Sequence, residues 1–371
     1  MARVYRLRAG GTGVYGALKR LLFQLDPERA HHMALAFLKT AQASGMVRAA
    51  LRAPAPSPRL ALRWLGMEVP VPLGMAAGFD KGAEAYNALH SLGFGHVEIG
   101  TVTPRAQIGN EGLRVQRWPD QKALVNRMGF PGPGMLPVAR RLAKRPPLGI
   151  VGGNVGPNKT TPADKVADDL RAAAAAIAPH VRFITINISS PNTPGLRALQ
   201  APEAVAHLVQ ATMEAAAEAG ASRPVLLKLH PDASDDELVA VARSAVNAGA
   251  SGIIATNTTR SRPPGTESAI EGGLSGAPLL ARARQAIAAL HHGLGRDVPI
   301  VGVGGIMTGA DALGHIRAGA SLVQGYTGFI YRGPRFAPLV HAELVAAMDK
   351  AGIDRIADAV GTAPATPASS T

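Results

Sequence analysis

The chain has 371 residues, enough for one large domain or two medium ones, and its 47% hydrophobic and 18% charged residues form a globular balance. The absence of cysteine excludes disulfide bonds, thiolate metal sites, iron–sulfur clusters and a cysteine nucleophile or base. The formal net charge is +13, of which the eleven basic and two acidic residues within 1–63 contribute +9, so the nearly neutral body is not expected to bind nucleic acid.

Two helices are expected ahead of the main body. Apolar side chains three and four residues apart predict the first helix over residues 14–25. Asp26 and Pro27 suit the N-cap and the first position of a second helix, which continues to about Ser44. The segment 33–38 of that helix is apolar on nearly every side, so it needs a second burying partner besides the protein body.

The basic residues of this segment suit an anionic membrane surface, and solvated charge around ordinary helices is the alternative. No apolar run approaches the roughly 20 residues of a membrane span, and no signal peptide is expected. We expect a helical module over residues 1–52, a proline-rich linker over 53–59, a main domain over 60–350 and a disordered tail over 351–371.

Eight short apolar runs alternate with helical stretches in the main domain. Continuous apolar runs predict strands buried on both faces, and helices are expected between them at 164–178, 202–219 and 234–248. Eight such units predict an α/β fold, a closed (β/α)8 TIM barrel, whereas an open doubly wound sheet would need a dinucleotide fingerprint that is missing. The runs lie near residues 73–77, 97–101, 148–154, 183–189, 225–229, 252–256, 300–304 and 322–325.

Active sites of such barrels lie at the carboxyl ends of the strands. Those ends carry amides, hydroxyls and two lysines but few carboxylates, which argues against a glycosidase. His31 with His32 and His291 with His292 are adjacent pairs, which do not face each other on a helix, so no metal site is expected.

The glycine-rich ends of the last two strands indicate an anion cradle. Residues 302–305 and 326–328 occupy the loops that grip a phosphate in many barrels, through bare backbone N–H groups and a helix N-terminus. Glycine lets the backbone approach such a group closely, although a tight corner alone also favours glycine.

Five asparagines at or near strand ends offer paired donors and acceptors, which suit a neutral ring with alternating N–H and C=O groups, as in a flavin or a pyrimidine. Two lysines then have natural roles, one at a substrate carboxylate and the other at the electron-rich edge of a cofactor. The residues are Asn126, Asn154, Asn187, Asn192 and Asn257, with Lys81 and Lys228.

These segments together resemble the membrane-associated, quinone-dependent (class 2) dihydroorotate dehydrogenases, over about residues 14–345. The start of the second helix, at Asp26–His31, is also similar to that of the family. The motifs that carry the resemblance are Ala76–Lys81, Ile99–Pro104, Asn126–Phe130, Asn187–Gly195, Ala255–Thr259 and Gly302–Ile306.

The resemblance implies an enzyme of pyrimidine biosynthesis that oxidises dihydroorotate to orotate. One noncovalent FMN per chain would take a hydride from C6 at flavin N5, and electrons would pass on to a membrane quinone. Ser190 matches the family's serine base for the C5 proton, and Thr193 with a trapped water would relay that proton. The protein would be a monomer, attached peripherally to the cytoplasmic face of the cell inner membrane.

The resemblance also implies residue roles, with residues 193–197 as a lid over the substrate. The chain departs from the family at Pro157 and His230, where a lysine and a small apolar residue are common. FMN would be lined by Ala77, Gly78, Phe79, Asp80, Lys81, Thr101, Asn154, Asn187, Lys228, Thr256, Gly276, Gly305, Tyr326 and Thr327. Orotate would be held by Lys81, Asn126, Arg127, Met128, Gly129, Phe130, Asn187, Asn192, Asn257 and Thr258.

The resemblance gives the helical module a role as an apolar tunnel from the bilayer to the flavin, with Phe23 and Leu35 inserted in lipid and arginines on anionic headgroups. Two other interpretations stay open from the residues. One is an FMN barrel oxidoreductase with a different substrate, and the other is a non-redox phosphate-binding barrel, such as an aldolase that forms a Schiff base at Lys228. The visible absorbance of a bound flavin separates these interpretations.

Overall fold

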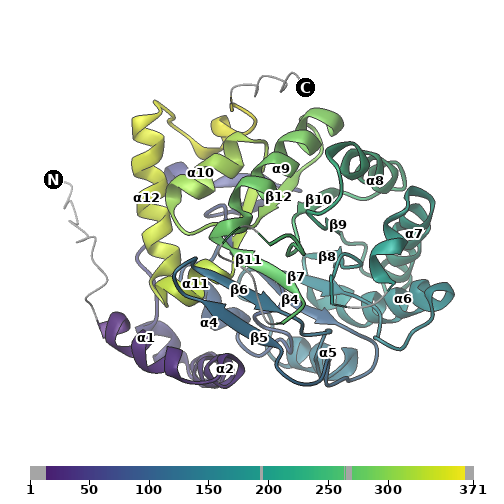
Figure 1. Cartoon of the computed structure of the whole chain (residues 1–371), viewed down its shortest axis with the longest axis horizontal. Helices are drawn as coiled ribbons and strands as arrows, with labels where there is room; N and C mark the ends of the chain where they lie inside the picture. The colour runs from purple at the N-terminus through teal and green to yellow at the C-terminus, as the bar shows by residue number, and fades with distance from the viewer. Residues whose placement is uncertain (1–13, 193–194, 263, 265–269, 364–371) are drawn as a thin grey trace.

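The computed structural model describes residues 14–192, 195–262, 264 and 270–363, and it confirms the closed barrel (Figure 1). All eight barrel strands pair in parallel in the order β10-β12-β13-β3-β4-β7-β8-β9, and β9 closes onto β10. Each predicted apolar run overlaps one strand, since such runs remain buried on both faces of the sheet. The strands are β3 (Leu73–Met75), β4 (His96–Val102), β7 (Ile150–Val155), β8 (Phe183–Ile186), β9 (Val225–Leu229), β10 (Gly252–Ala255), β12 (Ile300–Val303) and β13 (Leu322–Gly325).

Helices form a ring outside the strands, as Figure 1 shows. The three helices predicted from the sequence are present as α6 (Val166–Ile177), α7 (Pro202–Glu218) and α8 (Asp235–Asn247), and a 3₁₀ turn at Ala163–Lys165 precedes the first. The ring also contains α4 (Tyr86–Ser91), α5 (Met135–Lys144), α9 (Leu280–Leu294), α10 (Gly309–Arg317), α11 (Thr327–Arg332) and α12 (Phe336–Lys350).

Two small antiparallel sheets, which were not expected from the sequence, cover the two ends of the barrel. At the amino-terminal end, β1 (Leu62–Trp64) pairs with β2 (Met67–Val69), and the ring of Trp64 packs edge-on against Phe183. At the carboxyl-terminal end, β5 (Val115–Trp118), β6 (Ala123–Asn126) and β11 (Gly273–Gly276) form a sheet in the order β11-β6-β5. The second sheet roofs the end of the barrel where the predicted site lies.

The N-terminal helices form a head, which we define as α1 (Val14–Gln24), α2 (Pro27–Ala43) and α3 (Gly45–Ala50). Asp26 caps α2 as predicted, since its carboxylate accepts the N–H groups of Glu28 and Arg29. The Tyr15 hydroxyl donates to the carbonyl of Ile330 at 2.7 Å, and Arg114 pairs with Glu28 at 2.6 Å. These contacts dock the head beside α11 and β5, at the lower left in Figure 1.

The exposed apolar side chains of the head differ from those expected to enter lipid. Phe23 and Leu35 are half-buried, because Phe23 packs edge-on against Tyr331 and Leu35 contacts the core. No helix within the described residues is long and apolar enough to cross a membrane. The exposed apolar face instead carries Leu18, Leu21, Leu25, Met33 and Phe37.

The prediction of a disordered tail over 351–371 is wrong for residues 351–363. Ile356 and Ala359, in the 3₁₀ turn Ile356–Ala359, are buried, and the N–H of Ala363 donates to the carbonyl of Arg317 at 2.8 Å. Burial of these two side chains attaches residues 351–363 to the helices outside the barrel. Residues 364–371 lie outside the described part.

The packing of the barrel's amino-terminal end predicts a cost for any side chain at Gly152. A Cβ there would lie 2.1 Å from Cζ of the Phe183 ring, so we expect Gly152→Ala to lower the free energy of unfolding by about 1–3 kcal/mol through overpacking. Urea denaturation measures the change. Gly45→Ala is the control, since a Cβ added at Gly45 would meet nothing within 4 Å, and equal stability of both variants would contradict the packing described.

Candidate active site

A cavity of about 660 Å³ extends from the head to the carboxyl ends of the barrel strands. Its volume falls within the roughly 300–1,000 Å³ range of ligand sites. Leu22, Met33 and Phe37 line it from the head, and Asn187, Lys228 and other polar strand-end residues line it from the barrel. The cavity is therefore apolar toward the exposed face of the head and polar at the strand ends.

Most of the predicted site residues meet at this cavity. Asp80, Asn154 and Arg127 do not line it in this structure, so their expected contacts with FMN or orotate stay predictions. Pro157 and His230, where the chain departs from the family pattern, do not line it either. The predicted residues that do line it are Ala77, Gly78, Phe79, Lys81, Thr101, Asn126, Met128, Gly129, Phe130, Asn187, Ser190, Asn192, Lys228, Thr256, Asn257, Thr258, Gly276, Gly305, Tyr326 and Thr327.

A buried carboxylate, Glu98 of β4, lies beneath the polar end of the cavity. One of its oxygens accepts from Nδ2 of Asn154 at 2.6 Å, and the other accepts from Nε2 of Gln324 at 2.7 Å. Asn154 in turn accepts from the Thr101 hydroxyl at 2.6 Å and from Nδ2 of Asn187 at 3.1 Å. Asn154 thus acts one layer behind the cavity, where it orients the two side chains that face the ligand.

The same hydrogen-bonded row continues to the cavity surface. Oδ1 of Asn187 accepts from the Ser189 hydroxyl at 3.2 Å and from Nδ2 of Asn257 at 3.3 Å. Oδ1 of Asn257 accepts the N–H of Thr258 at 2.8 Å. Because each amide is held by its neighbour, the donors and acceptors at the strand ends are oriented before any ligand arrives.

Lys228 is a buried ammonium that makes no ion pair with any described residue. Burial lowers the pKa of Lys228, and the charge of Glu98 acts in the opposite direction. Oε1 of Gln324 is likewise buried without a hydrogen-bond partner among the described residues. Both groups line the cavity and call for a ligand that offers an acceptor and a donor.

Lys81 and Asp80 are adjacent in sequence but have different roles. The Lys81 ammonium donates to the carbonyl of Gly78 at 2.6 Å and lines the cavity, and its pKa falls to about 8 through burial and the nearby charge of Arg114. The Asp80 carboxylate instead accepts the N–H groups of Glu84 and Ala85, at 2.7 and 2.8 Å, at the start of α4. Burial raises the pKa of Asp80 to about 6. Asp80 therefore shapes the loop that presents Lys81.

Ser190 lies at the cavity wall with 5% of its surface exposed. Among the described residues its hydroxyl oxygen has one hydrogen bond, which it accepts from the N–H of Asn192 at 3.2 Å. Asn192 is held by Asn126, whose Oδ1 accepts from Nδ2 of Asn192 at 3.1 Å, and its own Oδ1 is buried without a partner among those residues. Thr193, the expected relay, and part of the expected lid lie outside the described residues.

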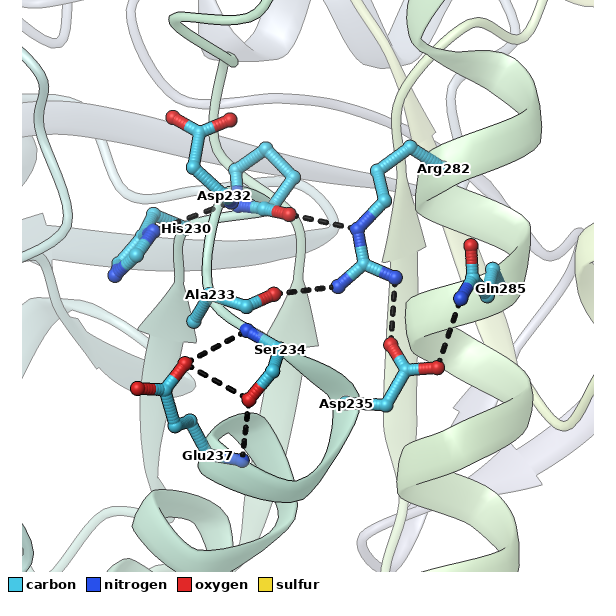
Figure 2. Close-up of polar contacts among 9 residues, drawn as sticks. His230, Asp232, Ala233, Ser234, Asp235, Glu237, Arg282 and Gln285 are labelled. Atoms are coloured by element: carbon cyan, nitrogen blue, oxygen red, sulfur yellow. Dashed lines mark hydrogen bonds and ion pairs between the residues drawn. The ribbon is translucent and has the colours of Figure 1, made fainter. Parts of the chain in front are cut away.

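Figure 2 shows how the loop between β9 and α8, which follows Lys228, is held in place. Arg282 of α9 donates to the carbonyls of Pro231 and Ala233 at 2.7 and 2.8 Å, and it pairs with Asp235 at 2.6 Å. A guanidinium suits this task because it places several donors in one plane. The loop is thereby attached to the neighbouring helix.

The same loop reaches the segment beside Ser190. His230 accepts the N–H of Asp232 at 3.2 Å, so its ring is engaged within the loop and not in the cavity (Figure 2). The Asp232 carboxylate accepts from the Thr259 hydroxyl and from the N–H of Arg260, and Arg260 donates to the carbonyl of Pro191 at 2.6 Å. These contacts link the strand ends of β8, β9 and β10.

Several functional candidates at the cavity were missed in the sequence. Glu28, His31 and Arg117 line it, and burial together with the charge of Lys81 lowers the pKa of His31 to about 3, so its ring is neutral. Glu98 and Gln324 were also missed. Each is a buried polar residue inside a largely apolar strand, and that exception in the apolar run could have identified it as a functional candidate.

Comparison with known proteins identifies the relatives of the chain. The sequence model of the family described as dihydroorotate dehydrogenase matches residues 59–348. A protein of Anaeromyxobacter dehalogenans (strain 2CP-C) named dihydroorotate dehydrogenase (quinone) is 48% identical over 94% of this chain and 96% of its own length. A protein of the same name from Acidithiobacillus ferrooxidans is 46% identical over 94% of this chain and 99% of its own.

Solved structures have the same fold. Eimeria tenella DHODH crystallised in complex with ferulenol matches with a TM-score of 0.83 and 34% identity, over 91% of this chain and 95% of that one. The ligand-free type from the same organism matches with a TM-score of 0.84 and 35% identity, over 91% and 99%.

The position of Glu98 predicts a large stability effect. Glu98→Ala leaves Asn154 and Gln324 unpaired and Lys228 without its nearest opposing charge, so we expect a loss of about 3–5 kcal/mol in the free energy of unfolding. Urea denaturation measures the loss, and Glu68→Ala, which removes an exposed partner of Arg63, should change stability by under about 1 kcal/mol. Similar small losses in both variants would show that the buried network contributes little.

Proposed function

This chain belongs to the quinone-dependent dihydroorotate dehydrogenases, and on that basis we propose how its cavity oxidises dihydroorotate to orotate. The family assignment makes it an oxidoreductase of pyrimidine biosynthesis and removes the non-redox barrel as an alternative. The observation that carries the proposal is one cavity with two chemically different ends. Oriented amides, Ser190 and two lysines meet at its barrel end, and apolar side chains of the head line its other end.

The residues at the barrel end fit FMN. Bound FMN would supply an acceptor for the hydride that leaves the substrate. The unpaired ammonium of Lys228 suits the electron-rich edge of the flavin ring, and Gln324 offers it a buried carbonyl oxygen. Thr101 and Asn187 present hydrogen-bonding groups that Asn154 has already oriented. The phosphate would lie at the loops after β12 and β13, where Gly305 and Thr327 line the cavity.

The substrate would lie beside Ser190. Asn126, Asn192 and Asn257 surround this point with amide groups that match a ring of alternating N–H and C=O groups, and the buried Oδ1 of Asn192 needs a donor. Lys81 would pair with the substrate carboxylate, because its ammonium lies at the same cavity wall. These contacts fix the ring so that one face meets the cofactor.

Ser190 would remove the proton from C5 of the substrate. A serine hydroxyl is a weak base in water, and here its oxygen also accepts the N–H of Asn192. The reaction therefore depends on a site closed from bulk water, from which the proton leaves along a short relay. Burial of Ser190 and the roof formed by β5, β6 and β11 support that closure.

The head would admit the quinone. The cavity reaches its apolar side chains, and Leu21, Met33 and Phe37 expose apolar surface that suits a lipid bilayer. Basic residues such as Arg20 would face anionic headgroups. We infer a peripheral protein on the cytoplasmic face of the membrane that acts as a monomer.

Replacement of Ser190 tests its role as the base. Ser190→Ala should slow reduction of the bound flavin by dihydroorotate about a hundred- to ten-thousandfold, because it removes the proposed base. Ser190→Cys should keep part of the rate, since a thiolate can remove the same proton. Anaerobic stopped-flow absorbance measures both, with flavin content as the control, and a near-normal rate in Ser190→Ala would exclude this role.

The pKa of Lys81 predicts how orotate binding depends on pH. Its pKa is lowered to about 8, and only the ammonium form pairs with a carboxylate, so the orotate Kd should rise by up to about tenfold per pH unit above that value. Below pH 8 the lysine is already charged and this dependence should vanish. Flavin difference spectra measure the Kd, and Lys81→Met should bind weakly with no such dependence. A flat profile for the unaltered protein would contradict the pairing.

A single leucine tests the membrane face of the head. Leu21 is 62% exposed, and Leu21→Glu should weaken binding to anionic liposomes about tenfold by removing an inserted side chain, without slowing flavin reduction. Leu148→Glu is the matched control, because Leu148 is 67% exposed just before β7, at the opposite end of the barrel. Liposome co-sedimentation measures binding, and high salt should weaken but not abolish it. Equal losses in the two variants would mean that the head is not the membrane face.

A further inference from the structure

His315 is a buried titratable side chain that the proposed reaction does not use. It lies on α10 with no exposed surface, and its Nε2 is 2.9 Å from the carbonyl oxygen of Gly304. Burial and the charge of Arg284 lower the pKa of His315 to about 4, so the ring is neutral at physiological pH. A neutral imidazole carries one N–H, and donation to a carbonyl oxygen assigns that proton to Nε2.

This hydrogen bond fixes a peptide that borders the cavity. The Gly304 carbonyl and the Gly305 N–H belong to one planar trans peptide, so they point in opposite directions. Because His315 holds the carbonyl on the helix side of the loop, the Gly305 N–H is turned toward the cavity, which both glycines line.

The peptide needs such an anchor because glycines flank it on both sides. Gly304 and Gly305 have φ of +134° and +77°, and a Cβ at Gly305 would lie 2.5 Å from Cα of Leu280, so other residues are excluded. Glycine pairs rotate more freely than other residues, and a flipped peptide would present a carbonyl oxygen where an anion binds. The bond from His315 selects the orientation that presents a donor.

The nearby start of α10, which follows the loop after β12, is not free to take over this role. The Asp311 carboxylate accepts the N–H groups of Met307 and Thr308 at 3.1 and 2.8 Å, and Glu343 accepts that of Gly309 at 2.9 Å. An anion placed there would meet two carboxylates. The phosphate would therefore rely on the backbone of the loops after β12 and β13 and not on the start of α10.

We propose that His315 is a positioning residue for the phosphate of FMN, which holds the Gly304–Gly305 peptide so that its N–H faces the phosphate. The proposal rests on FMN binding in the proposed function. The His315 ring contacts the loop from outside and does not line the cavity. A change at His315 should therefore affect binding of the phosphate and not binding of the flavin ring. The remaining ring nitrogen, Nδ1, has no partner among the described residues, so this bond is the ring's one polar contact there.

The test compares FMN with riboflavin, which has the same ring system but no phosphate. The full-length apoprotein is titrated with each flavin, and quenching of flavin fluorescence gives the two Kd values. His315→Phe keeps a ring but removes the donor, so it should weaken FMN binding about tenfold and change riboflavin binding by less than about twofold. His315→Gln, which restores an N–H donor, should recover most of the loss.

His341→Phe is the matched control, because His341 is also buried but lies on α12 and has no hydrogen bond to the loop among the described residues. It should leave the ratio of the two Kd values unchanged. Equal weakening of both flavins in His315→Phe, or no weakening of FMN, would overturn the proposal. If the ring of phenylalanine prevents folding, His315→Leu decides by the same ratio. Failure of the unaltered protein to bind either flavin would instead overturn the proposed function itself.

Discussion

Glu98 lies inside the barrel with both carboxylate oxygens satisfied, one by Asn154 and one by Gln324. A charge in such a place is costly unless it is hydrogen-bonded and balanced, and Lys228 on β9, which β7 and β8 separate from β4 in the barrel order, contributes an opposing charge. Asn154 in turn accepts hydrogen bonds from Thr101 and Asn187 and so orients their side chains. The polar wall of the cavity is thus oriented from beneath by Glu98 and Asn154, which do not line it.

The cavity has two chemically different ends, which are formed by two parts of the chain. The barrel end is polar, buried and closed by the β11-β6-β5 sheet, which suits hydride and proton removal away from water. The head end is apolar and opens beside exposed leucine, methionine and phenylalanine side chains, which suits a lipid-soluble acceptor. Contacts such as Arg114 with Glu28 and Tyr15 with Ile330 hold the head against the barrel, and we propose that one cavity serves both half-reactions.

The barrel was predictable because its signal is local: each strand is a continuous apolar run, and Asp26–Pro27 marks a helix start within two residues. The β11-β6-β5 sheet was not predictable, because β6 pairs with β11 across about 150 residues of chain. Neither strand shows a clear alternation of apolar and polar residues. Asn154 lies near the end of β7 and Asp80 follows β3, as the cavity residues lie at or after strand ends, and only side-chain direction separates them. For the same reason the sequence could not tell that Phe23 and Leu35 face the protein while Leu21 and Phe37 face outward.

We propose that dihydroorotate is oxidised at the polar end of the cavity by a bound flavin. The most direct measurement is anaerobic addition of dihydroorotate to the purified holoprotein, followed through the visible absorbance of the flavin. We expect complete bleaching, stoichiometric formation of orotate and recovery of the absorbance when a quinone is added. A flavin that stays oxidised in the presence of excess dihydroorotate would contradict this mechanism.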